Sequence, residues 1–113
     1  MNGKIYTAKR RLPPKILAKS ATTEEVSPFE DRFNIEFTSK AKEHTVKLFI
    51  DDIPVSAGVQ ALGNDRFKVV ASIVFKSRLA HLSMIVNCDL GESVFKASYE
   101  CENFIDAEGK DCF

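Results

Sequence analysis

Apolar side chains fall on every second position through most of the stretch 31–105. The pattern is clearest in the runs 67–75, 82–90 and 95–101, where each apolar residue is followed by one that is usually polar. A repeat of two residues is that of a β-strand with one buried face, since successive side chains of a strand point to opposite sides. Together with three less regular runs at 33–37, 46–50 and 55–61, it predicts six consecutive strands.

Turn residues between these runs predict how the strands pair. Gly, Asn, Asp and Pro gather at 51–54 and at 63–65, as they do in tight turns, and Gly91 with Glu92 suits the centre of a two-residue hairpin turn. An even loop length keeps the apolar positions of two paired strands on one face. A loop at 40–43 would place Ile35 opposite Leu48. A loop at 77–80 would place Ile73 opposite Met84, and a turn at 91–92 would place Met84 opposite Tyr99.

A six-stranded antiparallel meander with one apolar face must cover that face. Burying each large apolar side chain is worth roughly 1.5 to 3 kcal/mol, so the sheet closes into a small barrel, folds over near Gly58 into a sandwich, or packs against a second subunit. At 113 residues the chain has room for one such core. The fold class predicted is therefore all-β, a single-domain six-stranded antiparallel meander forming a small barrel or sandwich.

The chain divides by composition into three parts: an extended N-terminal arm at 1–30, the β-domain at 31–106 and a short C-terminal tail at 107–113. Pro13 and Pro14 favour an extended backbone in the arm. Such an arm packs on its own sheet, stays mobile, or reaches a neighbouring molecule. The basic residues between 4 and 15 interrupt every apolar stretch near the N-terminus, so we expect neither a signal peptide nor a membrane span and assign the protein to the cytoplasm.

Charge and residue chemistry exclude more than they identify. Sixteen basic and sixteen acidic side chains cancel, which removes a global attraction to nucleic acid or to an anionic membrane. Cys88, Cys101 and Cys112 have no metal-site spacing and are expected to be reduced thiols, with a disulfide between the first two disfavoured by the register. His44 and His81 stand far apart. Acidic pairs occur only in a turn and in the tail, at Asp51–Asp52 and at Asp106 with Glu108. We therefore expect no metal, no cofactor, no small-molecule substrate and no enzyme activity.

Apolar residues on the outer face of the predicted sheet are the candidate partner-binding site. In the predicted register Val70 and Val74 flank Ile85, and an outward apolar patch on a small protein commonly marks a contact with another molecule. The alternative is that the arm folds back and covers this patch with Ile5, Ile16 and Leu17. The candidate partner-binding residues are Phe49, Val70, Val74, Ile85 and Val94 on the sheet, with Ile5 and Tyr6 in the arm.

A basic cluster in the arm supports a second interpretation. Lys9, Arg10, Arg11 and Lys15 could neutralise phosphates while Tyr6 and Phe49 stack on bases, as in single-stranded nucleic-acid binders. Such binders normally have a strongly basic face, which a neutral chain does not predict, and an oligonucleotide-binding barrel would place a helix between its third and fourth strands. Nucleic acid is therefore a possible but not a favoured partner.

Taken together, the residues predict a non-enzymatic protein-binding or assembly protein that contacts other subunits, or its own copies as a homo-oligomer, through the outer sheet face and the arm. An accessory protein of a viral particle is one setting with this profile. The alternatives are a small inhibitor that blocks a target protein and the single-stranded nucleic-acid-binding barrel.

Overall fold

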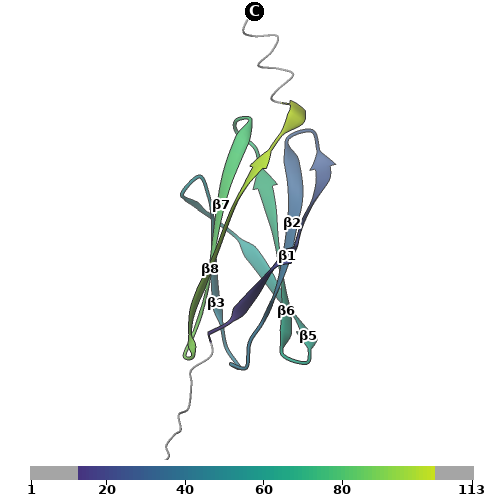
Figure 1. The fold of residues 1–113 in the computed structure, drawn as a ribbon. Coiled ribbons are helices and arrows are strands. Elements are labelled where there is room, and N and C mark those ends of the chain that lie inside the picture. The colour runs from purple at the N-terminus through teal and green to yellow at the C-terminus, as the bar shows by residue number, and fades with distance from the viewer. Residues whose placement is uncertain (1–12, 104–113) are drawn as a thin grey trace, which may run out of the picture.

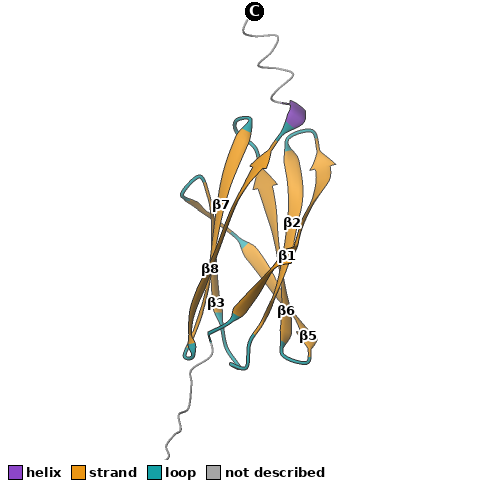
Figure 2. Cartoon of the chain, viewed as in Figure 1, coloured by secondary structure: helices purple, strands orange, loops and turns teal. Residues whose placement is uncertain are grey.

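The computed structural model describes residues 13–103, which form two antiparallel four-stranded sheets packed face to face (Figure 1). The first sheet has the order β1-β2-β6-β5 and the second the order β4-β3-β7-β8. Strands and short connecting loops make up almost all of the described chain (Figure 2). The strands are β1 (Lys15–Ser27), β2 (Glu30–Thr38), β3 (Thr45–Ile50), β4 (Ile53–Val55), β5 (Ala57–Gly63), β6 (Arg66–Val74), β7 (Leu79–Cys88) and β8 (Gly91–Glu100).

The all-β prediction is confirmed, but the strand count and the meander are wrong. Residues 13–103 form eight strands rather than six, arranged in two open sheets rather than a closed barrel. The chain makes one hairpin in one sheet, crosses to the other sheet for the next hairpin, and continues in this way. As a result β2 pairs with β6 and not with β3, and β6 and β7 lie in different sheets. Alternation could not reveal this, because a strand buries the same face whether the next strand lies beside it or across the core.

Two of the three predicted turns form where expected, and the third lies two residues earlier in the chain. Asp51 with Asp52, and Asn64 with Asp65, have positive φ angles between 52° and 68°, the conformation of the two-residue type I′ turn that matches the twist of a hairpin. In the third hairpin, β7 pairs with β8 as predicted, but Met84 lies opposite Phe95 rather than Tyr99.

The register of the β7–β8 hairpin differs because Gly91 follows the turn instead of opening it. Asp89 and Leu90 are the turn residues, and Gly91 closes the hairpin opposite Cys88 with φ 137°. A Cβ atom at Gly91 would lie 2.9 Å from the Cβ of Pro13, so glycine is required there both by the backbone and by packing. The slip is an even number of residues, and the predicted inner face of β8 is therefore retained.

Residues 15–27, which the sequence assigned to the arm, form edge strand β1 beside β2. The pairing register shifts by three residues between Leu17 and Thr22. The Ser20 hydroxyl bridges this bulge, since it accepts the Glu36 amide at 2.8 Å and donates to the Leu17 carbonyl at 2.6 Å. An odd shift moves the inward positions from one parity to the other, so β1 has no two-residue repeat and looks irregular in the sequence.

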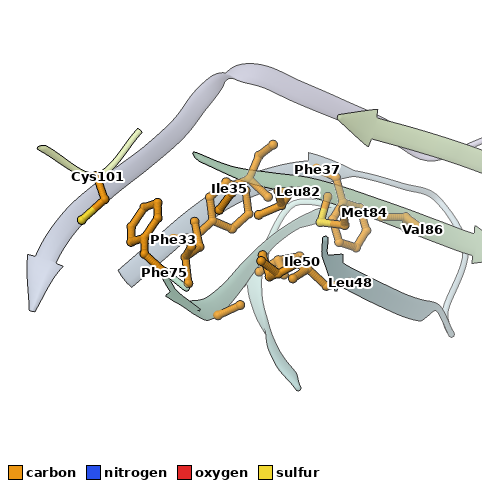
Figure 3. Packing of buried hydrophobic residues seen from close by; sticks show 14 residues of the cluster. Phe33, Ile35, Phe37, Leu48, Ile50, Phe75, Leu82, Met84, Val86 and Cys101 are labelled. Carbon is orange, nitrogen blue, oxygen red and sulfur yellow. The ribbon is translucent and has the colours of Figure 1, made fainter. Parts of the chain in front are cut away.

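The core lies between the two sheets (Figure 3). Phe33 and Phe37 of β2 are fully buried, as is Met84 of β7 from the opposite sheet. All but one of the buried apolar residues had been placed on the inner face by the alternation pattern; the exception is Ala80. The core residues are Phe33, Ile35, Phe37, Leu48, Ile50, Val69, Ala71, Ile73, Phe75, Ala80, Leu82, Met84, Val86 and Cys101.

Candidate protein interface

The structure separates the apolar patch that the sequence predicted. Val70 and Val74 lie on β6, on the outer side of the first sheet, whereas Ile85 lies on β7 in the second sheet. The two groups therefore face opposite sides of the sandwich, and the prediction that Val70 and Val74 flank Ile85 is wrong. It depended on pairing β6 with β7, which the structure does not contain.

Three of the predicted residues do come together on the outer face of the second sheet. Ile85 lies directly opposite Val94, and Phe49 lies on β3 next to β7, opposite Ser83. Only Val94, 51% exposed, is strongly accessible, since Phe49 and Ile85 are half-buried by their neighbours. This cluster is small, and it is bordered by Lys47, which lies opposite Ile85 on β3.

The predicted arm contacts lie mostly outside the described residues. Ile5, Tyr6, Lys9, Arg10 and Arg11 belong to this group. Lys15 is the first residue of β1 and is exposed. Ile16 packs against the core. It therefore does not cover the outer apolar residues, as it would if the arm folded back over them.

A more exposed apolar segment is β5, the edge strand of the first sheet. In Figure 1 it lies beside β6 at the lower margin of that sheet. Every residue from Gly58 to Gly63 is exposed, with Val59 at 46% and Leu62 at 41%. The alternation pattern places Val59 on the inner face of its sheet, but the second sheet does not cover it. β5 thus presents apolar side chains as well as a backbone edge that no other strand of residues 13–103 pairs with.

The hydrogen bonds of the neighbouring strands show which β5 backbone groups face that edge. The Ser39 amide donates to the Asp65 carbonyl and the Phe75 amide to the Phe29 carbonyl, both at 2.9 Å, so the odd-numbered residues of β6 bond to β2. In an antiparallel ladder the bonding direction alternates. The even-numbered residues of β6 therefore bond to Gly58 and Gln60, which leaves the backbone groups of Ala57, Val59 and Ala61 directed away from the sheet.

The other three sheet edges carry features that hinder strand pairing. β4 has three residues, one of them Pro54. β1 includes Lys15, Lys19, Glu24 and Glu25, and β8 includes Glu92, Lys96 and Glu100. Short length, proline and charge are the means by which native sheets protect their edges. β5 has none of them, because its seven residues include no charged residue and no proline.

Two basic side chains near the end of β5 form ion pairs within the chain. The Arg66 guanidinium binds the Glu36 carboxylate, and Lys40 Nζ lies 3.0 Å from a carboxylate oxygen of Asp65. The Lys40–Asp65 pair is exposed to solvent and contributes little to stability. The edge itself is electrically neutral, which makes it suitable for contact with another uncharged strand.

Sequence reasoning placed 55–61 in a strand but assigned its apolar residues to the core. The signal that could have identified β5 as an interface is the absence of any charged residue between 53 and 64. In a chain in which 28% of the residues are charged, such a stretch is typical of a buried strand or of a surface that binds another molecule.

A second feature is an open hollow between the 40–45 loop and the β7–β8 turn, with a volume of about 780 Å³. His44 lies there with its ring against Phe37 and Phe67, at centroid distances of 5.2 and 4.7 Å. Its Nε2 is buried and has no hydrogen-bond partner among the described residues. Burial lowers the pKa of His44 below 6.5, while the negative charge of Asp89 acts in the opposite direction. Burial therefore disfavours the protonated imidazolium.

The hollow is lined by both Cys88 and His44, two residues that the sequence analysis did not bring together. The Cys88 sulfur accepts the Leu90 amide at 3.4 Å, and no hydrogen bond reaches it from the unpartnered Nε2 of His44. A nucleophile and base would need such a bond. Cys88 and the buried Cys101 are both free thiols.

Residues 13–103 contain no cluster of three or more histidine, cysteine, aspartate or glutamate side chains that could hold a metal ion. No helix in this part of the chain has the length and hydropathy needed to cross a membrane. The chain matches no protein-family model and no curated protein.

Proposed function

We propose that this chain is a non-enzymatic protein-binding module, used in assembly, that adds edge strand β5 to a strand of a partner protein. The observation that carries the proposal is the contrast among the four sheet edges: three are shortened, charged or broken by proline, and β5 is uncharged, exposed and unpaired. An unprotected edge of this kind pairs readily with another strand.

The backbone supplies the affinity in such a contact. Ala57, Val59 and Ala61 direct their N–H and C=O groups outward, and strand addition satisfies these groups with the backbone of the partner. Val59 contributes an apolar side chain that is covered when a strand lies beside it. The binding surface is thus a short, rigid element held in place by the β5–β6 hairpin.

Assembly suits this surface better than inhibition of one specific target. Discrimination between partners generally depends on charges or pockets that penalise the wrong protein, and β5 offers neither. An accessory role in a viral particle, which the sequence analysis gave as one setting, belongs to the same class. The outer cluster of Phe49, Ile85 and Val94 remains the second candidate surface, because it is the one part of the predicted patch that the structure assembles.

Two matched variants test the proposal. Val59→Lys places a charge on the β5 edge, and Val94→Lys makes the same change at a valine of similar exposure on the outer face of the other sheet. Tagged wild-type and variant proteins are expressed in the native host, cross-linked, purified and compared by mass spectrometry.

We expect at least one protein, which includes the chain itself, to be retained by the wild type and by Val94→Lys but lost from Val59→Lys. If no protein is retained in a Val59-dependent manner while both variants remain folded by circular dichroism, the proposed function is wrong. Loss confined to Val94→Lys would instead assign binding to the outer cluster.

A further inference from the structure

We propose that the partner of β5 is a second copy of this chain, paired antiparallel through a two-fold axis at Val59 so that the two first sheets become one continuous sheet. This inference rests on the proposed function and names its partner. It specifies a register, and it can fail while the broader protein-binding role stands.

The position of the axis follows from the backbone. The edge-facing groups belong to Ala57, Val59 and Ala61, a set that is symmetric about Val59. A two-fold axis there pairs Val59 with the second copy's Val59, and Ala57 with its Ala61, so that every edge-facing group finds a partner. The register shift between Ala61 and Gly63 ends the straight part of the strand, as bulges commonly do.

Side-chain sizes fit the same register. The two half-exposed valines meet at the axis and bury each other, and paired β-branched residues are favourable neighbours across strands. Gly58 lies opposite the second copy's Gln60, which leaves space for the longer side chain. The remaining cross-strand pairs join alanine to alanine. No side chain of the strand meets one that is too large to lie beside it.

Charge also permits self-association. An uncharged strand can pair with a neutral strand of another protein. It can equally pair with its own copy, because no like charges then face each other. The nearest cation on the outer face is Lys68, opposite Gln60 on β6. The two Lys68 residues would be three strand spacings apart, about 14 Å, which exceeds the screening length of roughly 8 Å at physiological salt.

The contact is small, so the dimer should depend on concentration. A single strand pair buries less area than the roughly 1,200 to 2,000 Å² of stable protein interfaces. Val59→Lys would place two like charges directly opposite each other at the axis, and we expect it to raise the dissociation constant roughly tenfold or more. Val26→Lys, at a valine that is 51% exposed on β1, should leave that constant unchanged. Light scattering over a concentration series measures both values.

Cysteine cross-linking tests the register. Gly58→Cys and Gln60→Cys are prepared separately, and both positions tolerate the change because Gln60 is exposed and a Cβ at Gly58 meets only the Val70 carbonyl at 3.8 Å. In the proposed register the two cysteines face each other across the interface as a closely spaced pair. A mixture of the two variants should therefore form a disulfide-linked dimer, whereas each variant alone should not.

The control is a mixture of Lys96→Cys and Ser98→Cys, which has the same spacing on edge strand β8 and should remain unlinked. Self-linking of Gln60→Cys alone would move the axis and overturn the proposed pairing. Absence of any cross-link, together with a monomeric mass at every concentration, would overturn the second copy as partner. A different protein retained through Val59 would in that case leave the protein-binding function intact, and its absence would remove both.

Discussion

A disulfide between positions 32 and 72 tests the pairing of β2 with β6, on which the two-sheet arrangement depends. Arg32 lies opposite Ser72, and both side chains are exposed on the outer face of the first sheet. The two positions form a pair that is not hydrogen-bonded, because the β2–β6 bonds fall on odd-numbered residues. Side chains in such pairs are close, so Arg32→Cys with Ser72→Cys should oxidise readily.

The size of the effect follows from the loop that the bond closes. Roughly 40 residues lie between the two cysteines, and the chain-entropy model then gives a stabilisation of about 4 kcal/mol. Engineered disulfides often deliver less, and even half of this value would raise the melting temperature by roughly 10 °C. Loss of the ion pair between Arg32 and Glu24 subtracts little, since both side chains are more than half exposed.

Thermal unfolding by circular dichroism, with and without reductant, measures the stabilisation, and peptide mapping confirms which thiols are linked. The control is Ser72→Cys with Ile85→Cys, a pair that would face each other in a six-stranded meander and that the sandwich places on opposite outer faces. Formation of the 72–85 bond in the monomer, with no 32–72 bond, would refute the two-sheet topology.

Two further predictions concern Gly91 and His44. Gly91→Ala should lower the free energy of unfolding by about 1 to 3 kcal/mol, which is more than the loss expected for Gly63→Ala. Both glycines have positive φ angles, but only Gly91 has Pro13 within contact distance. Equal losses of the two variants in denaturant titrations would contradict a role for this contact. Stability should fall as the pH drops through about 6.5 and then level off, since the unfolded chain binds a proton that the folded chain, with its lowered His44 pKa, does not. His44→Phe should remove this part of the pH dependence and His81→Asn should retain it; an unchanged profile in His44→Phe would show that another group is responsible.

The alternation of apolar residues predicted which side of most strands is buried, but not which strands are neighbours. Ile35 and Leu48 were expected to pair within one sheet, and they instead meet across the core from opposite sheets. Both arrangements bury the same side chains. The choice between them depends on how the loops carry the chain from one sheet to the other, and loop composition carries little information about this.

The candidate interface was predictable only in part. Phe49, Ile85 and Val94 share a face because β3, β7 and β8 are neighbours, while Val70 and Val74 were grouped with them only through an incorrect pairing. Val59 keeps the inward phase of a core residue, yet it is exposed because the second sheet does not extend over it. Exposure of this kind depends on how two sheets overlap, which a single strand does not encode.

Hydrogen exchange of the β5 amides, followed by NMR over a range of protein concentrations, tests the central claim most directly. We expect the amides of Gly58 and Gln60 to be protected at every concentration, because they bond to β6. The amides of Val59 and Ala61 should exchange rapidly in dilute samples and become protected as the concentration rises. Rapid exchange of Val59 and Ala61 in the most concentrated sample would contradict pairing of this edge with a second copy of the chain.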